Sequence, residues 1–593
     1  MGLPLPISAD RGRWSTVLAE RTVLGVVHNI TSATRLLDLL AAFEGDARVQ
    51  VVFSCTGSSA LDSGVTEFFT AHGMAYVPWE EARDSEDFDL AIATSRGGDL
   101  HLLRTPLIGT PHGAGYNKKL ARNRKPETGN RKPETGNRKP ETVGPGAEES
   151  GGGAFGLTEE WLVHDGQLIP SAVVLSHSEQ LDRLAVSCPQ ALPAAVVAGD
   201  PVIDQLRAGL PFRERYRRAL GVEPGQRLVV LSSTWGRGSS FGTMSHSDII
   251  RRSMAELPSD EFRVLAAIHP NAWYGAHHSW QLHHWLAPLL DSGLILPPPE
   301  SETWKAALCA ADFLIGDHGS VTLYGHALGI PSLLSAFDSS TVAPDSPMHD
   351  LGERLPRIRR SIPLARQLAA AERNQHRPEE PYDPVTSRPG EAAALLRTLF
   401  YSWLKLPEPE QPAVTRAVPV PPGPPARRTL PHLPARYVTT DVDGEGDAAG
   451  GDEGATRLTL RRYPAAHQRS QNGHLAGAHL VADLDDPDQR LPRTADVLLV
   501  PLDRRPPELR RPEPGQLTAY EETGHGCRVT ILPNSLSLQA RWVHRPSWAD
   551  FGVAASVVHA LLPRVAEGAD RHLVRVRSGE QQDVGVLELR RAT

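Results

Sequence analysis

Short apolar runs rich in β-branched residues alternate with amphipathic stretches in the first part of this chain, and this alternation constrains the fold more than any other feature. It extends from about Arg21 to Leu206. The runs that we expect to form strands are Thr22–Val27, Val49–Phe53, Leu90–Ala93 and Ala172–Leu175. Amphipathic stretches between them, such as Ala33–Phe43 and Ser63–His72, have the spacing of helices. Alternation of strands and helices predicts a parallel sheet with helices on both faces.

The same alternation begins again near Leu228. The strands predicted there are Leu228–Ser232, Val264–Ile268, Phe313–Ile315 and Ser332–Leu334. The predicted helices are Ser247–Glu256, Trp280–Leu290, Ser301–Ala311, Val321–Leu328 and Gly390–Leu404. Two such halves, joined near Pro211, predict an α/β protein with two facing, Rossmann-like, doubly wound domains at residues 21–206 and 207–406. Ligands of open parallel sheets bind at the carboxyl ends of the strands, so we expect a site in the cleft between the halves.

Three further segments lie outside this pattern. Residues 1–20 form an N-terminal extension. Residues 121–153 contain tandem copies of NRKPETG followed by a glycine-rich stretch. Proline in every copy forbids a continuous helix, and the repeat offers no apolar face, so we predict a disordered loop insertion. Residues 407–434 contain ten prolines in 28 residues, which predicts a stiff linker.

The remaining residues, 435–593, are predicted to form a small α+β module. The acidic, glycine-rich stretch Asp441–Gly454 near its start is expected to be disordered. The predicted strands include Asp496–Val500, Arg528–Leu532 and Leu573–Val576, and one helix is predicted at Phe551–Val565. No motif in this module indicates a chemical reaction.

Composition excludes several classes of protein. The chain has 593 residues, of which 40% are hydrophobic and 22% charged, so it can form several cores and is too balanced for global disorder. A net charge of −8 gives no general attraction to nucleic acid. No apolar run approaches the roughly 18 residues that a membrane span requires. The N-terminus lacks an extended apolar region, so we expect no signal peptide and a cytoplasmic location.

Metal and nucleotide-hydrolysis motifs are also missing from the sequence. Its four cysteines lie far apart without a CxxC pair, which argues against a zinc site and against a disulfide scaffold. The paired histidines of HHSWQLHH would diverge on a helix, so we predict no metal there. No lysine stands in a GxxxxGK[ST] setting, which excludes a P-loop.

The strongest indication of a ligand site is Ala311–Leu334, ADFLIGDHGSVTLYGHALGIPSLL. A buried strand is expected to end at Ile315, and a short turn leads to Ser320, where a helix begins. Ser320 is expected to be the N-cap, which leaves the amides of Val321 and Thr322 at the start of the helix. Those amides and the positive end of the helix dipole predict an anion site. The alternative is an ordinary capped turn between a strand and a helix.

Two histidines follow predicted strands at the same edge of their sheets. In AIHP, Pro270 favours an extended conformation of His269, whose imidazole can then donate a hydrogen bond to a diphosphate. In IGTPHGAGYNKKL, glycines near His112 allow close approach to a ligand, and an imidazole is suited to act as a general base. Lys118 in the same loop suits an anion. The alternative readings are a structural histidine and a flexible glycine loop.

A fourth segment, SSTWGRGSSF at Ser232–Phe241, follows the first strand of the second half. Its hydroxyl groups, arginine and glycines suit contacts to a phosphate or a ribose. The letters of GxSxG at Gly238–Gly242 do not indicate a nucleophile, because that serine does not come immediately after the strand.

Taken in order, these motifs resemble those of the CDP-glycerol glycerophosphotransferases, the GT-B-fold polymerases and primases of teichoic acid. LCAADFLIGDHGSVTLYGHALGIPSLL looks like the family signature, PHGAGYNK is similar to its acceptor-side loop, and LSSTWGRG resembles its threonine–tryptophan strand end. VVLSHSEQLDRL and VVAGDPVIDQL resemble its inter-domain crossover, and IHP its donor motif. The resemblance covers about Arg21 to Leu406. A more distant similarity is to the UDP-N-acetylglucosamine 2-epimerases, which share the GT-B frame.

The resemblance implies transfer of an alcohol phosphate from a CDP-linked donor to the hydroxyl of a lipid- or polymer-linked acceptor. It places the acceptor side in residues 21–206 and the donor side in residues 207–406. It implies that His112 is the general base and that His269 contacts the donor diphosphate. The implied donor-binding residues are Thr234, Asp317, His318, Gly319, Ser320, Val321 and Thr322. The implied acceptor-side residues are Gly113, Asn117 and Lys118. No metal or cofactor is implied, because relatives on this frame mostly work without a metal.

The chain departs from the family pattern in two places. The tyrosine–serine pair of the signature reads His318–Gly319 here, which removes one hydroxyl, and the acceptor loop lacks the usual residues after its histidine and glycine. Two alternatives therefore stay open. One is an NDP-sugar glycosyltransferase or an enzyme like the UDP-N-acetylglucosamine 2-epimerases, and the other is a non-catalytic nucleotide-binding scaffold. The resemblance is compatible with peripheral contact at the inner face of the membrane.

Overall fold

The computed structural model describes most of the chain. The described residues are 17–59, 62, 64–119, 154–242, 248–274, 279–374, 385–423, 433–443, 455–465, 475–502, 515–522, 526–531, 536–567 and 571–591. The repeat insertion predicted at 121–153 lies outside them, as do residues 1–16, the middle of the proline-rich linker and most of the acidic stretch Asp441–Gly454.

The first alternating region forms a six-stranded parallel sheet with the strand order β2-β1-β3-β4-β7-β8. Its strands are β1 (Arg21–Val27), β2 (Val49–Cys55), β3 (Leu90–Ala93), β4 (Leu107–Gly109), β7 (Ala172–Leu175) and β8 (Ala195–Val197). The helices of this region are α2 (Ile30–Leu40), α3 (Val65–Ala71), α4 (Trp79–Asp84), α5 (Glu159–Leu162), α6 (Glu179–Ser187) and α7 (Pro201–Gly209). Both faces of the sheet are covered, because Val23 and Leu24 of β1 belong to two different apolar cores.

Helix α2 begins three residues earlier than the sequence pattern predicted. Asn29 is its N-cap and accepts a hydrogen bond from the Ser32 amide, while the Ser32 hydroxyl accepts one from the Asn29 amide. This capping box satisfies two of the amides that a helix start leaves without partners. The polar start of the helix therefore lies at the carboxyl end of β1, on the edge of the sheet where ligands are expected.

The second alternating region forms a four-stranded parallel sheet with the order β10-β9-β11-β12. Its strands are β9 (Arg227–Ser233), β10 (Phe262–Ile268), β11 (Phe313–Gly316) and β12 (Ser332–Leu334). The helices of this region are α8 (Arg213–Ala219), α9 (Asp248–Glu256), α10 (Pro270–Tyr274), α11 (Ser279–Asp291), α12 (Thr303–Ala310), α13 (Ser320–Ala327), α14 (Pro347–Arg354) and α15 (Leu364–Arg373). The predicted strands of both regions are therefore confirmed to within a few residues at each end.

Helix α16 (Ala392–Leu404) follows the second sheet in sequence but packs into a core of the first one. Phe400 lies 5.5 Å from Phe43, measured between ring centroids, and the Tyr401 hydroxyl donates to Asp46 at 2.7 Å. The end of the predicted range 207–406 thus belongs structurally with the first sheet. Apolar burial drives this return, because α16 presents Leu396, Phe400 and Leu404 to that core.

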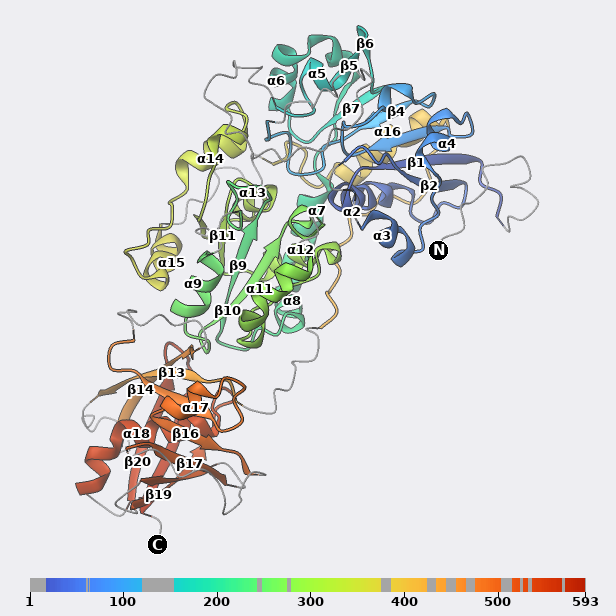
Figure 1. Ribbon diagram of the computed structural model, residues 1–593. Coiled ribbons are helices and arrows are strands. Elements are labelled where there is room, and N and C mark those ends of the chain that lie inside the picture. The colour runs from blue at the N-terminus through green and yellow to red at the C-terminus, as the bar shows by residue number, and fades with distance from the viewer. Residues whose placement is uncertain are drawn as a thin grey trace, which may run out of the picture.

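The C-terminal residues form a closed barrel of nine strands, which lies beyond the second sheet in Figure 1. The strands are β13 (Arg436–Asp443), β14 (Thr456–Pro464), β15 (His479–Asp483), β16 (Val497–Val500), β17 (Leu517–Glu522), β18 (Gly526–Ile531), β19 (Leu536–His544), β20 (Arg571–Ser578) and β21 (Gly585–Arg591), with helices α17 (Arg490–Thr494) and α18 (Phe551–Glu567). The predicted α+β module thus contains more strands than the sequence pattern revealed, and they close on themselves. The described part of the chain is mixed α/β, with two parallel sheets, a closed barrel and a two-stranded antiparallel sheet of β5 (Val163–His164) and β6 (Gln167–Leu168).

A buried ion cluster joins the barrel to the second sheet. The Arg462 guanidinium on β14 donates to both oxygens of Asp260, at 2.8 and 2.7 Å, and to Asp550 at 2.6 Å. Asp260 precedes β10 and also accepts from the Ser578 hydroxyl at 3.0 Å. Because each charge is paired and hydrogen-bonded, the contact avoids the large penalty of a lone buried ion.

Among the helices of the described part of the chain, none is both long and apolar enough to cross a membrane.

Candidate functional site

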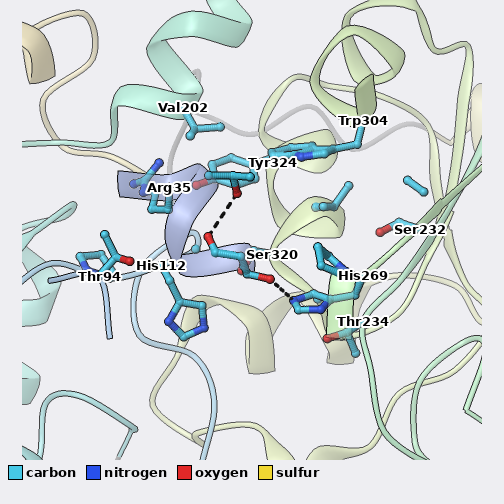
Figure 2. Close-up of a pocket in the computed structure, with 18 of the residues that line it drawn as sticks. Arg35, Thr94, His112, Val202, Ser232, Thr234, His269, Trp304, Ser320 and Tyr324 are labelled. Carbon is cyan, nitrogen blue, oxygen red and sulfur yellow. Dashed lines mark hydrogen bonds between the residues drawn. The ribbon is translucent and has the colours of Figure 1, made fainter. Parts of the chain in front are cut away.

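A cavity of about 170 Å³ lies where the carboxyl ends of the two parallel sheets meet. Loops that follow β3, β4, β9, β10 and β11 supply its walls, together with the start of α2. Figure 2 shows the side chains of Arg35 and His112 from the first region opposite those of Thr234, His269 and Ser320 from the second. Strand ends of parallel sheets gather loop residues in this way because all strands of each sheet point in the same direction.

Most of the residues singled out in the sequence lie at this cavity. Those in its lining are Gly113, His112, Asn117, Lys118, Thr234, His269, His318, Gly319, Ser320 and Val321. Asp317 and Thr322 do not line it and are fully buried behind it. The structure therefore brings two sequence-distant histidines and the start of α13 together, while their chemical roles stay predictions.

Asp317 holds the turn that precedes α13. Its carboxylate accepts hydrogen bonds from the backbone amides of Gly319, Thr234 and Ser240, each at 2.9 Å. The Thr322 hydroxyl accepts one from the Asp317 amide at 3.2 Å. The Asp317 carboxylate thus joins this turn to the loop after β9, and the Thr322 hydroxyl holds the turn itself. The expectation that the two side chains contact a donor directly does not match their buried position.

Gly319, and not Ser320, is the N-cap of α13. The Gly319 amide donates to Asp317, so it is not free for an anion, and glycine has no side chain with which to cap the helix. The amides of Ser320 and Val321 stand in the first helical turn, where a helix offers no carbonyl partner. The helix start on which the predicted anion site depends therefore lies one residue earlier than the sequence indicated.

His269 has a defined tautomer. Its Nδ1 accepts a hydrogen bond from the Asn271 amide at 3.0 Å, so the ring proton of the neutral form is on Nε2. Nε2 lies 3.4 Å from the Thr31 hydroxyl, the contact drawn as a dashed line at His269 in Figure 2. Burial, and then the positive charge of Lys118, lowers the pKa of His269 well below 6.5. At neutral pH the ring is therefore an uncharged donor at the cavity wall.

His112 lies on the loop after β4. Burial is the largest cause that lowers its pKa to about 4, and the charge of Lys118 lowers it further, against a hydrogen bond with the Thr94 backbone. The ring is thus neutral near pH 7 and can accept a proton. Gly113 beside it lies so close to Ser320 that a β-carbon there would overlap the Ser320 hydroxyl. The glycine is needed for this approach of the two regions.

Lys118 reaches from the first region to the second. Its Nζ donates to the Thr234 hydroxyl at 2.8 Å and lies 5.3 Å from the centroid of the Trp235 ring. Burial lowers the pKa of Lys118 to about 8, although Asp317 opposes the shift. The backbone around it pairs with residues 341–343, since the Lys119 amide donates to Thr341 and the Ala343 amide donates to Asn117. The loop is therefore anchored on both sides of the cavity.

Two arginines at the cavity were not singled out in the sequence. Arg35 and Arg96 are each only 5% exposed, and both line the cavity. Arg35 pairs with Asp200 at 3.2 Å, and Arg96 donates to the Tyr116 hydroxyl at 3.2 Å. In each guanidinium, however, Nε and Nη1 have no hydrogen-bond partner. Most buried polar side-chain atoms in proteins have a hydrogen-bond partner, so these four nitrogens are exceptions.

The sequence carried a weak signal for each of these arginines. Arg35 interrupts the apolar face of the stretch that became α2, and Arg96 follows β3 by a few residues at the strand end. An arginine on a helix is usually solvated, so the position of Arg35 does not indicate a binding site without the tertiary structure.

Two carboxylates in the cavity lining, Asp38 and Glu302, form a cluster with Lys305. Lys305 on α12 donates to Asp38 on α2 at 2.7 Å and to Glu302 at 2.8 Å. Burial and the neighbouring charge of Asp38 raise the pKa of Glu302 to about 7. Glu302 also has a left-handed backbone conformation, with φ of 49°. Within the described part of the chain, no group of three or more His, Cys, Asp or Glu side chains is arranged to hold a metal ion.

No family model and no curated protein matches this chain. Among solved structures, a variant of the wall teichoic acid polymerase TagF soaked with CDPG is similar, with 14% identity, coverage of 66% of this chain and 89% of that one, and a TM-score of 0.43. The UDP-GlcNAc 2-epimerase of Methanocaldococcus jannaschii with UDP-GlcNAc and UDP has 10% identity, coverage of 64% and 99%, and a TM-score of 0.40. HepE of Anabaena with UDP has 12% identity, coverage of 65% and 95%, and a TM-score of 0.33. Similarity at this level carries no argument about what the chain binds or does.

Proposed function

We propose that this chain is a GT-B-type transferase that moves a glycerol-phosphate-like group from a CDP-linked donor to an acceptor hydroxyl. The observation that carries the proposal is the convergence of three cationic residues, Arg35, Arg96 and Lys118, on one cavity, with both arginines almost fully buried. An anionic ligand in the cavity would offset the cost of burying these positive charges. The family resemblance of the surrounding motifs supports a nucleotide diphosphate as that anion.

On the donor side, the first turn of α13 and His269 are the proposed diphosphate contacts. The amides of Ser320 and Val321 and the Nε2–H of neutral His269 are donors at the same cavity. Such fixed donors stabilise charge that develops on a leaving phosphate without reorganising during the reaction. Thr234 contributes through its hydroxyl, which already accepts from Lys118.

On the acceptor side, His112 is the proposed general base. In the proposed step, the acceptor oxygen bonds to the phosphorus of the alcohol phosphate and its proton passes to the His112 imidazole. The bond from that phosphorus to the bridging oxygen breaks, and CMP leaves with the electron pair. A pKa of about 4 makes His112 a weak base. A bound diphosphate adds negative charge nearby and would raise that pKa towards the working pH.

A glycosyl-transfer reaction is the second candidate, and Glu302 favours it. This carboxyl group lines the cavity with a pKa of about 7, as an acid–base group in sugar chemistry requires. Phosphate transfer with His112 as the base does not require a second acid–base group such as Glu302. An NDP-sugar glycosyltransferase or a 2-epimerase-like enzyme would therefore depend on Glu302, and Glu302→Gln would abolish its activity while leaving glycerophosphate transfer.

Replacing Arg96 by methionine tests whether the cavity binds a nucleotide diphosphate. We expect the Kd for CDP, measured by calorimetry, to rise by about 10- to 100-fold, as loss of a charged hydrogen bond of about 1.5–3 kcal/mol predicts. The melting temperature without ligand should be unchanged or higher, because the variant removes a buried cation whose Nε and Nη1 have no partner. Arg104→Met is the control, since Arg104 is exposed and pairs with Glu86. A lower melting temperature with unchanged CDP affinity would contradict the proposal, and stabilisation by UDP but not by CDP would favour the second candidate.

The pH dependence of kcat/KM provides a separate test. His112 must be neutral to accept a proton, so its lowered pKa predicts that activity is lost only as the pH falls through about 4, not through 6.5. Lys118 must be protonated to hold the donor, so activity should fall as the pH rises through about 8. Lys118→Arg should move the alkaline limb to higher pH, and Lys118→Met should remove it. An acidic limb near 6.5 would contradict this placement of His112.

A further inference from the structure

One outer face of the C-terminal barrel is strongly basic, and we call it the arginine face. It is formed by the neighbouring strands β14, β20, β21 and β19. Side chains alternate between the inside and the outside along each strand, and exposed outward positions of these strands carry arginine. The arginines are Arg457, Arg541, Arg571, Arg575, Arg577 and Arg590. Among the described outward-facing residues of the same strands, Glu588 is the one carboxylate, and it pairs with Arg571 and Arg590.

The register of the strands places like charges beside one another on this face. Arg457 of β14 is aligned with Arg575 of the neighbouring β20, and Arg571 of β20 stands opposite Arg590 of β21. Like charges at facing positions of adjacent strands destabilise a sheet. The chain as a whole has a net charge of −8, so this excess of positive charge is local. A partner that brings carboxylates to the face would offset the repulsion between the arginines.

A surface of opposite charge surrounds helix α4 of the first region, and we call it the acidic surface. Two arginines lie there, and each is paired, Arg83 with Asp84 at 2.8 Å and Arg104 with Glu86 at 2.8 Å. The exposed carboxylates are Glu80, Glu81, Asp84, Glu86, Asp87 and Asp99. They outnumber the arginines, so the surface is negative. Figure 1 shows α4 and the barrel strand β20 at opposite ends of the molecule, so the two surfaces of one copy do not meet.

We propose that the arginine face of one copy binds the acidic surface of a second copy, so that the chains associate head to tail. Such a contact is heterologous, because different surfaces of the two copies meet. Guanidinium groups bind carboxylates through paired hydrogen bonds, and each copy supplies both surfaces in equal amount. A contact made of exposed ion pairs is weak and is screened by salt. The inference does not depend on the proposed function.

The test is sedimentation equilibrium of the full-length protein at about 10 mM and about 1 M salt, where the Debye length is about 30 Å and about 3 Å. We expect dimers or longer assemblies at low salt and monomers at high salt. Arg457→Glu combined with Arg577→Glu should raise the Kd of association by about 10- to 100-fold. Glu81→Lys combined with Asp87→Lys should have the same effect from the acidic surface. Arg366→Glu is the matched control, because Arg366 is exposed on α15 and belongs to neither surface.

A mixing experiment distinguishes this contact from other modes of association. In an equimolar mixture of the two charge-reversed variants, the native arginine face of one variant meets the native acidic surface of the other, so dimers should form again. Arg457→Thr separates binding from folding, because it removes one of two neighbouring like charges and places a good strand former at an exposed position. Its melting temperature at high salt should not fall, while its association at low salt should weaken.

Three results would overturn the inference. They are a wild-type protein that is monomeric at low salt, association that both charge-reversed variants retain, and a mixture of the two folded variants that forms no dimers. Phosphatidylglycerol vesicles provide the probe for a different occupant. If they bind the monomeric protein, and reversal of the arginine face abolishes that binding while self-association is absent, the face serves an anionic lipid surface and the inference is wrong.

Discussion

His112→Ala is expected to reduce transfer by about 10²- to 10⁴-fold, the usual contribution of a general base, while the Kd for CDP changes by less than about twofold. The imidazole lies on the loop after β4, in the wall of the cavity. The donors proposed for the diphosphate, on α13 and at His269, are provided by the second region and stay in place. The transfer rate is measured as release of CMP in the presence of an acceptor, and the Kd for CDP is measured by calorimetry.

His544→Ala is the control for this variant, because His544 is exposed on the barrel. A second comparison comes from hydrolysis of the donor by water, which does not need an acceptor hydroxyl. If His112→Ala transfers at the normal rate, His112 is not the base. If the variant also loses affinity for CDP, the ring contributes to donor binding and the division into two sides is wrong.

Asp317→Ala is expected to lower the free energy of unfolding by about 3–5 kcal/mol, as loss of a fully buried, hydrogen-bonded carboxylate predicts. Three backbone amides, those of Thr234, Ser240 and Gly319, would lose their acceptor in the interior. The turn before α13 would then lose its fixed position, so CDP affinity should fall together with stability. Urea unfolding followed by circular dichroism measures the first effect.

Asp317→Asn distinguishes this structural role from direct contact with a donor. One side-chain oxygen remains as an acceptor, so the loss of stability should be smaller than with alanine. Asp350→Ala is the control, because Asp350 is exposed on α14. If Asp317→Ala weakened CDP binding strongly without any loss of stability, the carboxylate would act on the ligand and not on the turn.

Several parts of the site could be predicted from local sequence. Each predicted strand of the two sheets ends in a loop that carries polar residues, and the rule for parallel sheets places such loops at one edge. His112, His269 and Ser320 lie at the cavity for this reason. The strand, the turn and the helix around residue 320 could be predicted because each depends on residues that are close together in the sequence.

Other parts could not be predicted because they depend on contacts between distant residues. The N-cap of α13 moves to Gly319 since Asp317 is held by amides from the loop after β9. The closure of nine short strands into a barrel depends on pairing such as that of β14 with β20, more than 100 residues apart. Arg35 resembles a surface residue of an amphipathic helix until the fold buries it beside Asp200.

The amino-acid sequence by itself determined where strands and helices form and which loops carry reactive side chains, because periodicity and capping act over a few residues. Only the tertiary structure decided which of those side chains share one space and with what charge and tautomer. Burial and neighbouring groups set those properties, and the walls that bury the site come from segments more than 100 residues apart, as the contact of Lys118 with Thr234 shows.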